Sequence, residues 1–188
     1  MEGRRIPPGQ KPIREFPVLS YGEVPCIDLS KWDLTVEGLV RNKLRLTWDE
    51  LLALPFISVT SDFHCVIGWS RLDNQWTGVR FVTIAKMADP LPDAKSVYMT
   101  ADDGYTTSVF LRDLMEDDVL LTYKFEDRPL DLNHGGPLRL VIPRKYAYKS
   151  IKWIRRIDFM AEQKVGYWEG RGYSDAADPW KEERYSSH

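Results

Sequence analysis

The sequence predicts a β-rich α+β domain. Most apolar residues fall in short stretches that alternate with polar residues or are rich in β-branched side chains, as strands are. Turn residues separate these stretches, and helical periodicity is confined to a few short segments. No internal repeat or low-complexity linker divides the chain. We therefore expect one domain over residues 1–188, a length that allows a substantial core.

The N-terminal part of the chain is expected to be extended before the first strand. Residues 1–31 contain five of the twelve prolines and little periodicity, which predicts an arm laid over the domain. Residues 32–40, WDLTVEGLV, predict a strand that enters a hairpin at a glycine. Residues 46–55 predict a short helix, because Thr47 can cap it, Glu50 stands at the capping-box spacing and a proline ends it.

The middle and C-terminal parts predict several further short elements. The β-branched stretch 56–66 predicts a strand that runs into a loop at a cysteine. Residues 78–88 are expected to start extended and turn helical, and residues 163–188 to form a C-terminal strap. The other expected elements are two strands around Asp-Asp-Gly in 95–111, a short helix, a strand and a turn in 112–130, a buried strand in 137–143 and a strand in 151–162.

Charge and composition narrow the classes of function. The net charge of −2 gives no broad attraction for nucleic acid or an acidic membrane. Seven tryptophans and nine tyrosines supply rings for a core or for pocket walls. The first sixteen residues lack the apolar region of a secretory signal, and no stretch has the length of a membrane span. We expect a cytoplasmic protein whose two cysteines, Cys26 and Cys65, are reduced.

Cys65, in the stretch DFHCVIGWS, is the first candidate for chemistry. A thiolate is a strong ligand for soft or high-valent metals, but His64, His134 and His188 follow no zinc-binding pattern. His64 is adjacent on the expected strand and so points to the opposite face, which argues against a Cys–His dyad. Taken alone, Cys65 is either a metal ligand or a small buried hydrophobe.

Residues 133–156 combine glycines, aromatic rings and basic groups. The glycines allow close backbone approach, and Tyr146, Tyr148 and Trp153 offer flat apolar walls. This mixture suits an anionic planar ligand, with a solvated basic strand edge as the alternative. The spacing is not that of a dinucleotide site or a P-loop. The basic residues are Arg139, Arg144, Lys145, Lys149, Lys152, Arg155 and Arg156.

Two loops carry further candidates. Tyr105 follows the tight turn in DDGYTTSVFL, so its hydroxyl either stands free at a pocket rim or its ring covers a hairpin end. Arg171 lies between two glycines in the aromatic-rich stretch 165–180. It either reaches a small oxyanion or belongs to a strap packed by aromatic rings.

Taken together, these segments resemble the molybdopterin-binding domain of the sulfite oxidase superfamily in its stand-alone form. The resemblance runs nearly end to end, through PPGQKPIREFPVL, WDLTVEGLV, DFHCVIGWS, WTGV, DDGYTTSVFL, HGGPLRLVIPRKYAYKSIKWI and YWEGRGYS. It implies short helices around mixed sheets and a molybdenum–molybdopterin cofactor. In that family a single cysteine thiolate binds molybdenum beside the pterin dithiolene, and Cys65 matches that position.

The resemblance also implies roles for other residues. Tyr105 matches an active-site tyrosine, and Arg171 matches an arginine that binds an oxyanion substrate. With Cys65 they form the expected catalytic set. Besides Cys65, the family's cofactor contacts fall on Arg14, Glu15, Thr100, His134, Arg139, Ser150, Ile151 and Lys152.

The implied activity is oxygen-atom transfer on a small oxyanion or S-oxide substrate. The 188 residues hold no Cys-x-x-Cys-His haem site, so we expect a separate electron-transfer partner: a haem protein, a flavoprotein or a quinone-linked subunit. Two alternatives stand beside the enzyme. One is a module that binds the pterin, or another anionic heterocycle, without turnover. The other is a structural domain with a Cys26–Cys65 disulfide.

Overall fold

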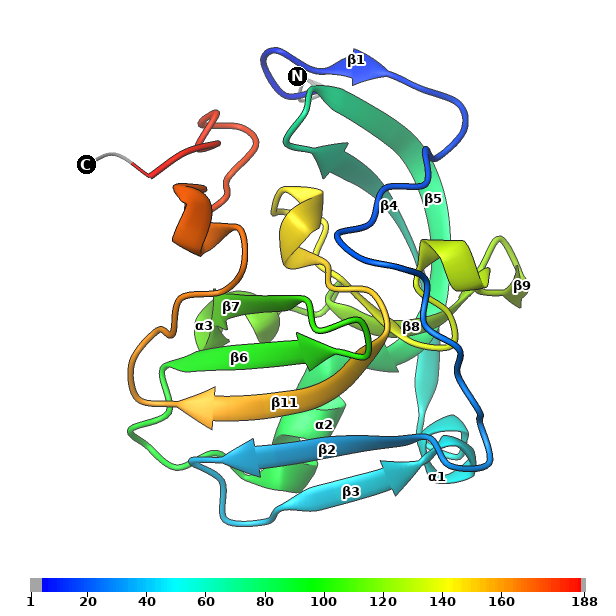
Figure 1. Cartoon of the computed structure of the whole chain (residues 1–188), viewed down its shortest axis with the longest axis vertical. Coiled ribbons are helices and arrows are strands. Elements are labelled where there is room, and N and C mark those ends of the chain that lie inside the picture. The colour runs from blue at the N-terminus through cyan, green and yellow to red at the C-terminus, as the bar shows by residue number, and fades with distance from the viewer. Residues whose placement is uncertain (1–4, 187–188) are drawn as a thin grey trace.

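The computed structural model of the chain describes residues 5–186, and its strands form two sheets (Figure 1). The six-stranded sheet contains β1 (Lys11–Pro12), β4 (Phe56–Cys65), β5 (Trp69–Arg80), β8 (Leu120–Phe125), β9 (Arg128–Pro129) and β10 (Arg139–Val141). The five-stranded sheet contains β2 (Asp33–Gly38), β3 (Leu44–Thr47), β6 (Ser96–Ala101), β7 (Thr106–Phe110) and β11 (Ile154–Met160).

Both sheets mix parallel and antiparallel pairs. The path β1-β5-β8-β10 runs through the larger sheet, with β4 beside β5 and β9 beside β8, and only β1 and β5 are parallel. The smaller sheet has the order β3-β2-β11-β6-β7, in which only β11 and β2 are parallel. The predicted β-rich α+β class, with short helices around mixed sheets, is confirmed.

The helices are short, as predicted. They are α1 (Trp48–Leu52), α2 (Phe81–Ala88), α3 (Leu111–Leu114) and the 3-10 turns η1 (Leu132–His134), η2 (Ala147–Lys149) and η3 (Glu169–Arg171). The predicted capping box of α1 is present: Glu50 N–H donates to Thr47 Oγ1, and Thr47 N–H donates to Glu50 Oε2 at 2.8 Å. None of the helices in residues 5–186 has the length and apolar character needed to cross a membrane.

Two predicted segments differ from the structure. The helix expected over residues 46–55 is limited to α1, because the residues before it pair with β2 as strand β3. The strand expected over residues 151–162 starts only at β11, so Ile151 and Trp153 precede it in the turn after η2. Trp153 adopts a positive φ of 48° there. The strap expected over residues 163–188 contains η3, and its last two residues lie outside the described range.

The packing divides into two apolar clusters. The larger one lies against the five-stranded sheet, where Phe81 of α2 packs on Phe159 of β11 with ring centroids 6.2 Å apart. The smaller cluster contains Phe63 and Trp76 of the β4–β5 hairpin and packs against Phe16 of the N-terminal arm. The second cluster matters for function, because it lies directly under the candidate site.

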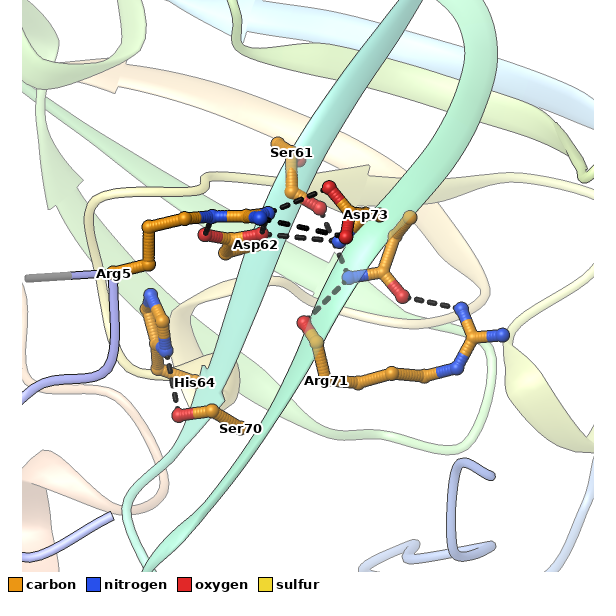
Figure 2. Close-up of polar contacts among 8 residues, drawn as sticks. Arg5, Ser61, Asp62, His64, Ser70, Arg71 and Asp73 are labelled. Atoms are coloured by element: carbon orange, nitrogen blue, oxygen red, sulfur yellow. Dashed lines mark hydrogen bonds and ion pairs between the residues drawn. The ribbon is translucent and has the colours of Figure 1, made fainter. Parts of the chain in front are cut away.

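The N-terminal arm, residues 5–31, is extended as predicted and contains no helix (Figure 1). Arg5 fastens its beginning to the β4–β5 hairpin: the guanidinium lies between Asp62 and Asp73, with nitrogen–oxygen distances of 2.6 Å to each (Figure 2). Further along, Arg71 Nε donates to the Arg14 carbonyl at 2.8 Å. These contacts bring the following arm residues to the mouth of a cavity.

Candidate functional site

A cavity of about 320 Å³ lies where the arm, the β4–β5 turn, the β6–β7 turn, the segment after β9 and the C-terminal strap meet. Seven of the eleven predicted site residues line it: Cys65, Tyr105, His134, Arg139, Ser150, Ile151 and Lys152. These residues come from four separate stretches of sequence, and the fold brings them to one place.

Cys65 is the last residue of β4 and is buried in the cavity wall. A tight turn follows it, closed by a hydrogen bond from Gly68 N–H to the Cys65 carbonyl at 3.0 Å. Burial raises the pKa of the Cys65 thiol, while hydrogen bonds from the Ile67 and Val66 backbone N–H groups act in the opposite direction. Amides directed at the sulfur in an apolar wall suit a thiolate that binds a cation.

The disulfide alternative is wrong for this structure. Cys26 is exposed on the arm and Cys65 is buried, and both thiols are free. His64 is engaged away from the cavity lining, as the strand alternation predicts: its Nδ1 lies 2.8 Å from Ser70 Oγ (Figure 2), and its ring packs on Trp180. His64 is therefore not arranged as a catalytic base for Cys65.

Arg139 and Lys152 give the cavity a cationic end. Arg139 Nη1 and Nη2 donate to the carbonyls of His134 and Ser150 at 2.8 and 2.9 Å, and burial lowers the Arg139 pKa to about 10. Lys152 Nζ donates to the Asn133 carbonyl at 2.7 Å. Burial, and then the charge of Arg139, lower the Lys152 pKa to about 8.

These two cations lack anionic partners. No carboxylate in residues 5–186 forms an ion pair with either side chain. Gly135, at a φ of 108°, lets them approach each other, because a Cβ there would lie 3.0 Å from Lys152 and 3.1 Å from Arg139 side-chain atoms. The charges of Asp103 and Asp131 act on Lys152 without forming an ion pair with it. Two cations without an ion-pair partner in a cavity wall favour a bound anion such as a phosphate.

His134 completes this end of the cavity. Its Nδ1 lies 3.3 Å from Asp131 Oδ1, and its buried Nε2 has no hydrogen-bond partner in the described part of the chain. A buried polar atom without a partner is costly, so this nitrogen suits a ligand contact. Ser150 has a structural role, since its Oγ accepts a hydrogen bond from Ile142 N–H at 3.0 Å.

Tyr105 lines the cavity, but its hydroxyl is hydrogen-bonded and does not stand free at the rim. A free hydroxyl is one of the two possibilities that the sequence predicts. The Tyr105 hydroxyl donates to the Tyr148 carbonyl at 2.6 Å. The ring packs between Tyr21 of the arm and Tyr167 of the strap, with centroids 6.5 and 6.0 Å away. Burial, and then the negative charge of Glu169, raise the Tyr105 pKa well above its ordinary value. Tyr105 is therefore a neutral hydrogen-bond donor.

Four predicted site residues do not line the cavity. Arg14 and Glu15 are exposed on the arm, and Thr100 lies in β6, paired with Arg156 of β11. The guanidinium of Arg171 stacks 3.5 Å from the Tyr167 ring centroid and donates to the Tyr167 carbonyl. This placement of Arg171 matches the packed strap that its sequence also allowed, and a substrate contact for it stays a prediction.

Sequence reasoning missed much of the cavity wall. The arm contributes Phe16, Pro17, Leu19, Ser20 and Tyr21, and the strap contributes Trp168 and Tyr173. The prolines and aromatic residues of the arm were the available signal, since an extended apolar segment must cover something. Only the fold shows that it covers this cavity.

The site combines one buried thiol with an unpaired cationic end. No group of three or more His, Cys, Asp or Glu side chains among the described residues could hold a metal ion by itself. The buried thiol and the two cations without ion-pair partners fit an anionic cofactor that brings a metal with it, as the resemblance implies. This arrangement fits the class of proteins that bind a metal through such a cofactor and one cysteine.

The particular family follows from comparison with known proteins. Residues 21–168 match the oxidoreductase molybdopterin binding domain, and the chain belongs to this family. It is 43% identical to the uncharacterized oxidoreductase YuiH of Bacillus subtilis over 97% of this chain and 92% of that protein. The cofactor of this chain is molybdenum–molybdopterin, as the resemblance implied.

Other relatives are longer than this chain. A putative protein-methionine-sulfoxide reductase subunit of Azospira oryzae, YedZ1, is 34% identical over 86% of this chain and 62% of its own length. The crystal structure of the sulfane dehydrogenase SoxCD from Paracoccus pantotrophus superposes with a TM-score of 0.68. That likeness covers 74% of this chain and 41% of that one, at 23% sequence identity, and concerns the fold.

Proposed function

We propose that this molybdopterin-binding oxidoreductase domain reduces a neutral S-oxide by oxygen-atom transfer. One observation carries the choice of substrate: apart from the cationic end, the cavity lining in the described chain has no basic side chain. The basic residues of the lining in the described chain are His134, Arg139 and Lys152, and all three belong to the cationic end. Next to Cys65 the lining is formed by Val66 and Ile67.

Arg184 does not change this picture. Its charge acts on Cys65, but its guanidinium donates to the Val66 carbonyl and stacks on the Tyr146 ring, outside the lining. An oxyanion such as sulfite needs a cation at the reacting atom. A neutral S-oxide needs only a hydrogen-bond donor and an apolar wall. The likeness to a putative methionine-sulfoxide reductase subunit supports the same choice.

The cofactor would be held at both ends. His134, Arg139 and Lys152 would bind its phosphate, and the Cys65 thiolate would bind molybdenum. When bound, this cofactor supplies two-electron redox chemistry and accepts or gives an oxygen atom.

The chain's own residues would orient the substrate and exclude water. Tyr105 can transfer its hydrogen bond from the Tyr148 carbonyl to the S-oxide oxygen, which polarises the bond that breaks. Trp168 and Tyr173 would hold the apolar substituents of the substrate. The overall reaction consumes two electrons and two protons and yields a thioether and water. We propose that a separate redox protein supplies the electrons.

The test uses protein produced in a host that makes the cofactor, with molybdenum per chain measured first. Reduced benzyl viologen with methionine sulfoxide probes S-oxide reduction, and sulfite with ferricyanide probes the oxidation of an oxyanion. We expect viologen oxidation that depends on methionine sulfoxide and no turnover of sulfite. Sulfite turnover without S-oxide reduction would contradict the proposal. A Cys65→Ser protein controls for reactions that do not need the site.

A non-catalytic binding module is the second candidate. The observation that favours it is the engagement of both predicted substrate-side polar groups: Tyr105 is hydrogen-bonded to Tyr148, and Arg171 is stacked on Tyr167. Protein with close to one molybdenum per chain that turns over neither substrate would support the module.

A further inference from the structure

A buried ion pair, Lys149 with Glu169, lies beside the cavity, and neither residue lines it. Lys149 Nζ and Glu169 Oε1 form a short contact, and their side chains are 0% and 2% exposed. Removing two charges from water usually costs more free energy than their attraction recovers, so a buried ion pair adds little to stability. Its better-attested use is to impose one particular arrangement of the chain.

The pair joins three segments that shape the cavity. Lys149 ends η2, between the lining residues Tyr148 and Ser150. Lys149 Nζ also donates to the Ser108 carbonyl of β7 at 2.9 Å. Burial lowers the Lys149 pKa, and the charge of Glu169 acts against this. Glu169 therefore favours the protonated form of Lys149, which burial disfavours.

Glu169 connects the same strand to the strap. Its Oε1 accepts a hydrogen bond from Thr107 Oγ1 at 2.7 Å, two residues after Tyr105. Glu169 directly follows Trp168, a lining residue, and begins the 3-10 turn η3. Tyr173, after that turn, lies close enough to Cys65 for the charge of its thiolate to act on the tyrosine. A shift of Glu169 would therefore move the wall beside Cys65.

We propose that Lys149 and Glu169 are a positioning pair that holds the Trp168–Tyr173 wall against Tyr105, and so sets substrate affinity without holding the cofactor. The pair makes no contact with His134, Arg139 or Lys152 among its described hydrogen bonds and ion pairs. Substrate affinity and cofactor retention should therefore respond separately. The inference rests on the proposed function for its kinetic part only.

The test removes both charges together, as Lys149→Met with Glu169→Gln. A single substitution would leave one uncompensated buried charge and endanger folding, whereas a neutral pair of similar volume is tolerated. We expect unchanged molybdenum content. The KM for methionine sulfoxide should rise by about tenfold or more, with a smaller change in kcat, because misplaced binding groups cost on this scale.

Hydrogen–deuterium exchange of cofactor-free protein provides a second measurement that does not depend on activity. The amides of Arg171 and Tyr173 donate to the Trp168 carbonyl, and we expect peptides over residues 166–174 to exchange faster in the double variant.

The control is Arg41→Met with Asp89→Asn, which removes an exposed ion pair outside the lining and should change neither measurement. Wild-type exchange in this segment together with a wild-type KM would overturn the proposal. If no protein turns over methionine sulfoxide, the proposed function fails, and the exchange data still decide the positioning role.

Discussion

At the scale of single residues, the two cysteines lie in different surroundings. Cys65 is buried in the cavity wall with backbone N–H groups directed at its sulfur, whereas Cys26 is exposed on the arm. The two thiols differ in surroundings rather than in chemistry. This gives a matched pair of substitutions for testing the ligand.

We expect Cys65→Ser to lose most of its molybdenum and Cys26→Ser to retain it, as measured by elemental mass spectrometry. Serine has nearly the same volume, and the Ile67 and Val66 amides can bond its hydroxyl. Burying that hydroxyl should therefore lower the free energy of unfolding by only about 1–2 kcal/mol. Wild-type molybdenum content in Cys65→Ser would refute the ligand assignment.

Lys152 gives the site a pH signature. Its pKa is lowered to about 8 in the folded protein, below its ordinary value of 10.5. Between these two values the folded protein binds fewer protons than the unfolded chain, so its stability rises with pH. Below pH 8 both states are protonated, and the folded state bears the full cost of the charge.

We therefore expect the stability of cofactor-free protein to rise between about pH 8 and 10, relative to Lys152→Met. Urea denaturation at several pH values measures this difference. A bound phosphate would favour the protonated lysine and remove the rise, so loaded protein serves as the comparison. An equal rise in loaded and cofactor-free protein would contradict the phosphate contact.

Part of the site can be predicted from the sequence, namely the residues that lie in local motifs. Cys65, His134 and Lys152 lie in motifs whose spacing is local, so the resemblance placed them in the cavity. Arg171 was placed by the same reasoning, yet its orientation depends on the neighbouring Tyr167 ring, which its motif does not specify. The wall formed by Phe16 depends on contacts far apart in the sequence.

At the scale of elements, local signals were reliable where the element is stabilised locally. The capping box of α1 is one case, since Thr47 and Glu50 satisfy each other's backbone N–H groups. We expect Thr47→Ala to lower the free energy of unfolding by about 1 kcal/mol, measured by urea denaturation, without changing molybdenum content. The control is Thr47→Ser, which keeps the capping oxygen. Equal losses in both variants would show that the cap does not stabilise the helix.

Strand β5 shows the opposite case. The sequence predicts no element over its first nine residues, although it is the central strand that pairs with β1, β4 and β8. Register shifts interrupt its pairing with both β4 and β8, and Asp73 adopts a positive φ of 55°. These irregularities break the alternation that marks a strand in sequence. Its partners, rather than its own pattern, therefore determine that it is extended.

At the scale of the whole molecule, the arm connects the two parts of the structure. It starts at the β4–β5 hairpin, where Arg5 is bound, and ends beside β2 of the other sheet (Figure 1). Between these points, Phe16 packs against Phe63 and Trp69 and lines the cavity. The cofactor would fill the space that the arm covers, so loading and the ordering of the arm should be linked.

This linkage predicts a difference in proteolysis. Trypsin can cut after the exposed Arg14 when the arm opens, and a ligand that binds only the closed form reduces that opening by mass action. We expect loaded protein to be cut after Arg14 at least about tenfold more slowly than cofactor-free protein, which corresponds to a ligand at tenfold its Kd. Cleavage after the exposed Lys43, in the β2–β3 turn, is the internal control and should not change. Equal cleavage after Arg14 in both forms would mean that the arm covers the cavity without taking part in binding.

A variant tests the same linkage. Phe16→Ala should abolish the protection, because the arm then loses its aromatic contacts with the cavity wall.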